Sequence, residues 1–327
     1  MILNLLLGII TFVELNCENL FDTRHDTLKQ DQEYLADGVR HGNRHRYWDK
    51  VNHIAKEIIS CGDQATGWQL PDFVALCEVE NDSVMRDLTQ RSSLRNAGYQ
   101  YVMTDSPDER GIDVALLYSP FSFRLLHSHA IRIEPLKKMR PTRDILYAAG
   151  TLVNGDTLHV MVVHAPSRFN GEKKTRPHRL LVADRMLATV DSIRALSPDA
   201  QIIIMGDFND EARDAAIKKM EHSGLYDISQ DAKGCNGAKG TYKYKSRWQS
   251  IDHILVSDAL RRRMVSCVIH DAPFLLEEDK KYGGVKPLRN YTGYRYNNGY
   301  SDHLPLVARF DDNKHAVHQF TLPSSRT

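Results

Sequence analysis

The sequence lacks the features that mark several common protein classes. Its five cysteines are scattered without a CxxC pair or a zinc-ligand spacing, so we predict neither a disulfide framework nor a structural zinc site. No apolar run approaches the length of a membrane-spanning helix. Lys and Arg total 43 against 42 for Asp and Glu. This balance argues against a nucleic-acid coat protein, which needs clustered cations in excess, but it leaves room for an enzyme with a few basic loops.

Low-complexity segments and short-period repeats are also absent. Hydrophobic residues make up 42% and charged residues 26% of the 327 positions, as is ordinary for a soluble globular protein. The N-terminal "MILNLLLGIITFV" resembles the apolar part of a signal peptide, but it has no basic region and no small-residue cleavage site. Residues 1–9 are therefore either the remnant of an export signal or the lead-in to a buried strand, and the compartment stays open.

Strand and helix patterns alternate along the chain. Apolar runs bounded by turn residues predict strands over 10–16, 73–81, 99–103, 113–119, 123–133, 145–153, 157–164, 202–205, 250–257 and 304–310. Apolar residues at helical spacing predict helices over 46–60, 83–98 and 178–196. The pattern favours α/β layers of sheet covered by helices. We expect one domain over 10–312, with a long, weakly periodic segment over 271–300 and a tail over 313–327.

Several predicted strands end in polar side chains. The run "IIIM" leads at once into Asp207 and Asn209, and comparable endings carry Asn16, Glu78 and His164, with Asp252 and Asp302 beside two further strands. Layered folds bring strand ends together at one sheet edge, so these endings predict a single polar pocket on an apolar floor. The carboxylates and amides are hard oxygen ligands that suit Mg²⁺ or Mn²⁺. Histidines and arginines beside such a metal suit a phosphate ester.

Seven motifs stand in the order found in the endonuclease/exonuclease/phosphatase family. They are "NCENLFD", "LCEVEN", "RGIDVALLY", "VVHAPSR", "MGDFND", "SIDHILVS" and "YSDHLP". Over about residues 10–312 the sequence resembles this family, which includes deoxyribonuclease I, abasic-site endonucleases, sphingomyelinases and inositol-polyphosphate phosphatases. The resemblance implies an α/β (α+β) fold in which helices flank a two-sheet sandwich, with the active site at one edge.

The resemblance also implies roles for the residues that would hold metal and phosphate. Glu78 is similar to the principal metal ligand, and Asn16 to the asparagine that bonds the phosphate or the catalytic water. Asp302 is similar to a second-site metal group, and Glu18 matches a nearby acidic position. Arg143 and Arg168 are predicted phosphate contacts, because Arg offers a bidentate fork.

The remaining matches concern catalysis. Asp207 resembles the aspartate that orients or deprotonates the attacking water, and Asn209 the amide that holds the phosphate. His164 falls where the nucleases carry a His or Tyr close to the scissile phosphate. Asp252 and His303 are similar to a paired carboxylate and imidazole, which we therefore expect to touch.

Simpler interpretations compete at some positions. Asp207 could cap a following helix. The "HSH" at 127–129 could bind a metal, but without a third ligand nearby we interpret it as a solvated face. The basic, aromatic segment 40–50 is interpreted as a solvated loop rather than a nucleic-acid track. His253 is expected to be structural.

Together these patterns predict a Mg²⁺-dependent hydrolase of phosphate esters, with Mn²⁺ as a substitute. A phosphodiesterase such as an endonuclease is favoured, with nucleic acid among the candidate substrates and the enzyme acting as a monomer without a protein partner. The alternatives are a phosphatase for an inositol phosphate or lipid head group, and an inactive binding module on the same fold. Two-metal phosphoesterases with GDxH and GNH signatures are disfavoured, because "GDFN" lacks the histidine and no GNH occurs.

Overall fold

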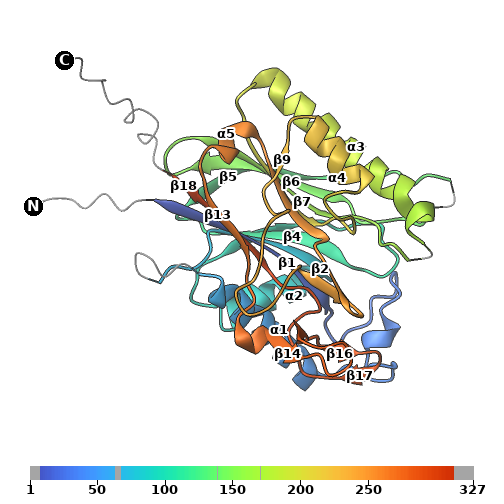
Figure 1. Ribbon diagram of the computed structural model, residues 1–327. Coiled ribbons are helices and arrows are strands. Elements are labelled where there is room, and N and C mark those ends of the chain that lie inside the picture. Colours follow the sequence, from blue (N-terminus) through green and yellow to red (C-terminus); the bar gives the residue numbers. More distant parts are fainter. Residues whose placement is uncertain (1–7, 63–67, 138, 170, 313–327) are drawn as a thin grey trace, which may run out of the picture.

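The computed structural model describes residues 8–62, 68–137, 139–169 and 171–312. Two six-stranded sheets pack face to face, and helices cover the outer face of each sheet (Figure 1). The predicted two-sheet fold flanked by helices is thus confirmed. Residues 1–7 of the expected lead-in and the expected tail over 313–327 lie outside the described residues.

The first sheet has the strand order β13-β18-β1-β2-β4-β3. Its strands are β1 (Ile9–Leu20), β2 (Phe73–Val79), β3 (Gln100–Met103), β4 (Asp113–Tyr118), β13 (Met264–Ile269) and β18 (Leu306–Asp311). Within this sheet β1 and β2 are parallel, and the other neighbours run antiparallel. The two parallel strands therefore end at the same edge of the sheet.

The second sheet has the strand order β5-β6-β7-β8-β12-β9. Its strands are β5 (Phe123–Ile131), β6 (Ile145–Leu152), β7 (Thr157–His164), β8 (Gln201–Asp207), β9 (Tyr226–Asp227) and β12 (Asp252–Val256). A turn at 154–156 joins β6 to β7. Here β7 and β8 form the parallel pair, and β12 runs antiparallel beside β8.

The core lies between the sheets, with a further apolar layer under each set of helices. Alternate residues of one strand serve two layers: Phe12 of β1 belongs to the inter-sheet cluster, whereas Val13 and Leu15 belong to the cluster beneath α1 (Arg44–Ser60). On the other side, α3 (Glu172–Leu196) and α4 (Ala215–His222) cover the second sheet (Figure 1). Because the central strands are buried on both faces, their sequences are nearly continuous apolar runs.

Two predictions about helices were wrong in part. Segment 40–50 is not a loop throughout, because α1 begins at Arg44, where the side chain of Asn43 accepts hydrogen bonds from the backbone N–H groups of His45 and Arg46. The helix expected over 83–98 is shorter: α2 (Asp82–Arg86) continues as one π turn, Asp87–Arg91, and then stops. Ser92 explains the stop, since its hydroxyl donates to the Leu88 carbonyl and accepts from the Leu94 N–H, replacing the bonds of a further helical turn.

The long segment 271–300 folds into short elements. A 3₁₀ turn (Pro273–Leu275) precedes the hairpin of β14 (Leu276–Glu278) and β15 (Val285–Pro287), and the two-residue strands β16 (Tyr291–Thr292) and β17 (Arg295–Tyr296) follow. A third small hairpin joins β10 (Tyr242–Tyr244) to β11 (Arg247–Gln249). Among the described residues, no helix combines the length and apolar character that crossing a bilayer requires.

Gly206, next to the end of β8, gives the first testable prediction. Its φ is +151°, and a Cβ built there would lie 1.8 Å from the Val163 carbonyl oxygen of β7. We expect Gly206→Ala to lower the free energy of unfolding by about 3–5 kcal/mol, since steric overlap and an unfavourable φ add. Urea denaturation measures this value.

Gly155 is the matched control for this substitution. It has φ +83°, but a Cβ there would meet nothing within 4 Å. Gly155→Ala should therefore cost only about 1 kcal/mol, the conformational penalty alone. Equal losses in the two variants would contradict the close-approach explanation.

Candidate active site

The polar strand ends of the two sheets meet at one edge of the sandwich. In the first sheet, Asn16 of β1 is in register with Cys77 of β2, so Glu78 follows directly beside it. In the second sheet, Asp207 of β8 pairs with His164 of β7 on one side and with Asp252 of β12 on the other. The strand registers thus bring the polar endings of each sheet to one edge, as the sequence predicts.

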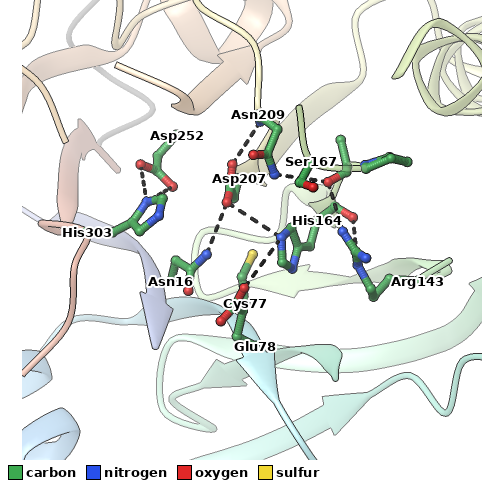
Figure 2. A network of polar contacts seen from close by, with 12 residues as sticks. Asn16, Cys77, Glu78, Arg143, His164, Ser167, Asp207, Asn209, Asp252 and His303 are labelled. Atoms are coloured by element: carbon green, nitrogen blue, oxygen red, sulfur yellow. Dashed lines mark hydrogen bonds and ion pairs between the residues drawn. The ribbon is translucent and has the colours of Figure 1, made fainter. Parts of the chain in front are cut away.

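Four of these side chains form a connected row (Figure 2). The Asn16 amide donates from Nδ2 to Asp207 Oδ2 at 3.1 Å, which joins the two sheets. His164 Nε2 lies 3.5 Å from the same Asp207 oxygen and 3.9 Å from Glu78 Oε1. The Asn209 N–H donates to Asp207 Oδ1 at 2.8 Å. Both Asp207 oxygens are thus fixed by neighbours.

Asp252 and His303 make the contact expected from the sequence. His303 Nδ1 lies 2.8 Å from Asp252 Oδ2 and 3.0 Å from Oδ1 (Figure 2). The Thr241 hydroxyl donates to Asp252 as well, and the Tyr242 ring packs on His303 with centroids 4.9 Å apart. Because Nδ1 is engaged, Nε2 is the ring nitrogen left for a substrate.

The backbone is strained at the same edge. Glu78 and Asn209 have φ values of +64° and +51°, and Glu18 and Asn19 have φ values of +47° and +60°. The pairing of β1 and β2 shifts register between Asn16 and Leu20, as a bulge does. Non-glycine residues adopt positive φ at a cost, and such residues concentrate at functional sites, where they re-aim side chains.

The two histidines of the site have opposite protonation preferences. Burial, together with the nearby Arg143 and Arg110, holds the pKa of His164 well below 6.5, so this imidazole is neutral at pH 7. Burial also disfavours charge on His303, but the carboxylates of Asp252, Asp302 and Asp207 outweigh it and raise the pKa of His303 well above 6.5. His303 is therefore cationic, and His164 offers hydrogen bonding without charge.

The pKa of Asp207 is raised to about 7, mainly because burial disfavours the carboxylate and because Asp252 is close, although His303 partly offsets both effects. The alternative that Asp207 caps a helix is wrong. No helix begins after β8 until Ala215, and the N-cap residue of that helix is Asp214. The Asp207 side chain instead belongs to the polar row.

The donor groups of this edge fit a divalent cation. One Glu78 oxygen accepts from the Asn19 N–H at 2.9 Å, whereas the contacts of Oε1 within the described part of the chain are longer, at 3.9 Å to His164 and to Arg110. Beside it, ligand atoms of Asp207, Asp252 and His303 all lie within 4.8 Å of one another. Closely spaced, buried carboxylates repel one another unless a cation or a proton compensates them, and oxygen donors are those that Mg²⁺ and Mn²⁺ prefer.

The strand ends lie in a cleft that Arg143 and Arg168, the predicted phosphate contacts, also line. Both arginines are extensively bonded to protein. Arg143 donates to the backbone oxygens of His164 and Ala165 at 3.2 and 2.9 Å and to Asp108 at 3.0 Å. Arg168 donates to the Asn209 carbonyl and to Asp214, both at 2.6 Å. These bonds hold the chain segments that carry His164 and Asn209, so phosphate contact by either arginine stays a prediction.

The remaining predicted residues occupy the periphery. Asp302 lines the cleft and lies 3.5 Å from Arg289. Glu18 is buried and accepts from the N–H groups of Asn290 and Tyr291 at 2.6 and 3.2 Å. Burial and the charge of Asp302 raise the pKa of Glu18 to about 7. Glu18 thus anchors segment 271–300 beside the site.

His127, His129 and His253, to which the sequence analysis gave no catalytic role, do not line the cleft. His127 and His129 form a pair on β5, with Nε2 and Nδ1 2.9 Å apart. His253 is buried behind the strand ends, with Nδ1 2.8 Å from Asp227 and Nε2 2.8 Å from the Asp210 carbonyl oxygen. That second contact supports the loop that follows Asp207.

Two residues escaped the sequence analysis. Arg110 lines the cleft and approaches Glu78. It could have been identified from its position in the motif "RGIDVALLY", which resembles the family. Glu14 faces inward from β1 between Phe12 and Asn16 and is fully buried, and neither of its carboxylate oxygens has a hydrogen-bond partner among the described residues. Burial and the charges of Asp252 and Asp207 raise the pKa of Glu14 well above 4.5, which favours its protonated form.

Comparisons with known proteins agree with this architecture. The sequence profile described as "Endonuclease/Exonuclease/phosphatase family" matches residues 10–311. A family protein of that description from Bacteroides thetaiotaomicron superposes with a TM-score of 0.59 at 13% identity, covering 95% of this chain and 98% of the other. A comparison with curated proteins returned no match.

Two further solved structures share the fold. Truncated TDP2 of Caenorhabditis elegans has a TM-score of 0.55 at 17% identity and covers 93% of this chain and 97% of its own. A mannosyl-6-phosphatase of Bacteroides thetaiotaomicron has a TM-score of 0.57 at 15% identity, with coverages of 91% and 98%. At such low identity these likenesses establish the fold alone.

The donor groups predict that the affinity for Mg²⁺ and Mn²⁺ depends on the charge of Glu78. Glu78→Gln keeps the shape of the side chain but removes its charge, so we expect Mg²⁺ and Mn²⁺ affinity to fall by about tenfold or more. Isothermal titration calorimetry measures the affinity. Glu109→Gln is the control, because Glu109 is a more exposed carboxylate of the same cleft. Equal affinities in the two variants would exclude Glu78 as a ligand.

The Asp252–His303 contact predicts a shift in pH dependence. Asp252→Asn removes the charge that raises the pKa of His303, so the alkaline limb of the pH–rate profile should move to lower pH and the rate should fall. Hydrolysis of bis(p-nitrophenyl) phosphate with Mg²⁺ and NMR titration of the His303 ring measure the two effects.

The double variant tests whether the two residues act as a unit. His303→Ala should lower the rate by roughly 10²-fold, and adding Asp252→Asn should change it little further. Losses that multiply, or an unchanged His303 pKa in Asp252→Asn, would show that the pair has no joint role.

Proposed function

The chain belongs to the endonuclease/exonuclease/phosphatase family, and from this premise we propose that it is a divalent-metal-dependent phosphodiesterase that cleaves nucleic acid. The observation that carries the proposal is the shape and lining of the cleft. It has a volume of about 1040 Å³ and contains Asn16, Glu78, His164, Asp207 and His303 on its floor and walls. A single phosphate group would fill only a small part of this volume.

The walls of the cleft suit a chain of phosphates and bases. Cationic side chains line it well beyond the strand ends, namely Arg110, Arg140, Arg168 and Lys174. Phe169 and Tyr244, with exposed fractions of 79% and 56%, add aromatic surface to the same lining. Cations that follow a phosphate backbone and exposed rings on which bases stack are the two elements of nucleic-acid strand binding.

Asp207 is the proposed base or orienting group for the attacking water. Its pKa near 7 lies in the range where a carboxylate can accept a proton at neutral pH. Asn16 and the Asn209 N–H fix its two oxygens, so a water bonded to Asp207 would be held in one direction. This positioning supplies part of the rate by ordering the reactants before reaction.

His303 is the proposed electrostatic group. With Nδ1 on Asp252, the cationic ring can donate from Nε2 to a phosphoryl oxygen, where negative charge increases during in-line displacement. His164, kept neutral, would donate or accept a hydrogen bond without adding charge. A divalent cation held by Glu78 and Asn16 would supply Lewis-acid polarisation of the phosphoryl group.

A substrate panel tests the proposal. With Mg²⁺, the protein should cleave single-stranded or duplex DNA or RNA oligonucleotides and the chromogenic diester, and it should be much slower on p-nitrophenyl phosphate, mannose 6-phosphate, inositol phosphates and sphingomyelin. Asp207→Asn should lower diester hydrolysis by ~10²-fold or more, the magnitude of a general base or a strong electrostatic contribution.

The panel separates the competing functions. Preference for a monoester would replace the proposal with a sugar- or inositol-phosphate phosphatase, and turnover of sphingomyelin alone would indicate a lipid head-group enzyme. Absence of any turnover, with strand binding intact, would indicate an inactive binding module.

A further inference from the structure

A second cavity lies beside the cleft and shares none of its lining residues. It has a volume of about 510 Å³ and is enclosed by the loop after β1, the first turns of α1 and the short helix α2 with its π turn. Four arginines and a tryptophan dominate its walls, namely Arg24, Arg44, Arg86, Arg91 and Trp48. We call it the arginine cavity.

In the part of the chain that the structure describes, two of the four arginines lack an ion-pair partner. Arg86 pairs with Asp82 at 2.7 Å and Arg91 with Asp87 at 2.9 Å. Within the described residues, the guanidinium groups of Arg24 and Arg44 make no hydrogen bond or ion pair.

Of the two carboxylates that line the cavity, Asp87 offsets the charge of Arg91, so Asp22 is the lining carboxylate left beside Arg24 and Arg44. Asp87 accepts from Tyr47 at 2.8 Å as well as from Arg91, and Asp22 accepts from the Arg24 N–H at 2.6 Å and from Asn81 at 3.4 Å. Four arginines against Asp22, Asp82 and Asp87 leave these groups with one excess positive charge, which suits an anion.

Helix α1 adds an aromatic wall to this cationic site. Arg44 and Trp48 are four residues apart, so they lie on the same face of the helix. Trp48 is half-buried: it packs against the apolar cluster beneath the first sheet and also lines the cavity. A planar ring beside unpaired guanidinium groups is the combination that binds a base next to its phosphate.

The cavity is close enough to the cleft for one substrate to reach both. The loop leaving β1 gives Asn19 to the cleft and Arg24 to the cavity, and the segment leaving β2 gives Glu78 to the cleft and Ser83 to the cavity. Five residues of chain span at most ~18 Å, so the separation is on the order of a few nucleotides. Helices α1 and α2 lie together on this side of the first sheet (Figure 1).

We propose that the arginine cavity is a second binding site for the nucleic-acid strand, with a phosphate held by Arg24 and Arg44 and a base stacked on Trp48. The inference rests on the proposed function, because it concerns the same substrate some nucleotides away from the scissile bond. It also gives the basic segment 40–50 a role that the active site does not use.

Strand binding without turnover tests the cavity directly. A fluorescein-labelled 12-nucleotide DNA single strand is titrated in EDTA and followed by anisotropy. Arg24→Ala/Arg44→Ala should weaken binding by about tenfold, and the slope of log affinity against log salt should fall by about 0.7 for each phosphate that the variant no longer binds. The control, Arg124→Ala/Arg185→Ala, removes the same charge from exposed positions on β5 and α3.

Substitutions at Trp48 test the stacking. Trp48→Phe keeps an aromatic face and should bind within about threefold of wild type, whereas Trp48→Leu keeps apolar packing but loses the face and should bind about tenfold more weakly. Thermal unfolding of both variants checks that the apolar cluster tolerates the change. Equal strand affinities of Trp48→Phe and Trp48→Leu would exclude a stacked base.

Activity measurements separate the cavity from the proposed function. The arginine double variant should hydrolyse bis(p-nitrophenyl) phosphate at the wild-type rate but show a raised KM for the oligonucleotide. If the control double variant binds the strand as weakly as Arg24→Ala/Arg44→Ala, the proposal that the arginine cavity binds the strand is wrong. If the cavity variants weaken binding but wild type cleaves no oligonucleotide, the proposed function fails and the binding site stands.

Discussion

The hydrogen bond between Asn16 and Asp207 depends on almost every other feature of the fold. The two residues are 191 positions apart and belong to different sheets, yet Nδ2 and Oδ2 approach to 3.1 Å. This contact requires that β1 and β2 end together, that β7 and β8 end together, and that the sheets stack with those edges aligned. The apolar cluster between the sheets fixes this alignment, so the packing that stabilises the fold also sets the geometry of the site.

Among the described residues, four of the seven non-glycine residues with positive φ lie at the strand ends of the site, namely Glu18, Asn19, Glu78 and Asn209. Glu78 lies at a positive φ between Cys77 and Val79, both of which remain paired with β4. The bulge rotates the carboxylate out of the sheet while the strand continues. Asn209 does the same after β8, where its N–H turns back to Asp207. The cost of such conformations is of order 1–3 kcal/mol each, and the surrounding buried strands overcome it.

The sequence predicted the strands and their polar ends because each signal is local: an apolar run followed within two residues by a carboxylate, amide or imidazole. It also predicted the Asp252–His303 contact, but only through the family resemblance. Partners distant in sequence could not be read from one chain. Nothing near Arg143 indicates that it would bind the carbonyl of His164, and nothing near Arg24 indicates that Trp48 would share its cavity. The early stop after Arg91 was missed because one serine hydroxyl decided it.

Electrostatics explains why this edge calls for a cation. The charges of Asp252 and Glu78 both act on Asp207, with His303 as the cation beside it, and burial weakens the screening that water would provide. Protonation relieves part of this repulsion, because the pKa of Glu14 is raised well above 4.5 and the pKa of Asp207 to about 7. A bound divalent cation would relieve the same repulsion by attraction, and it would favour the ionised form of Asp207 that can accept a proton from water. Binding of such a cation would therefore link folding stability to the protonation state of Asp207 through one set of charges, because a ligand that binds only the assembled strand ends stabilises the fold that brings them together.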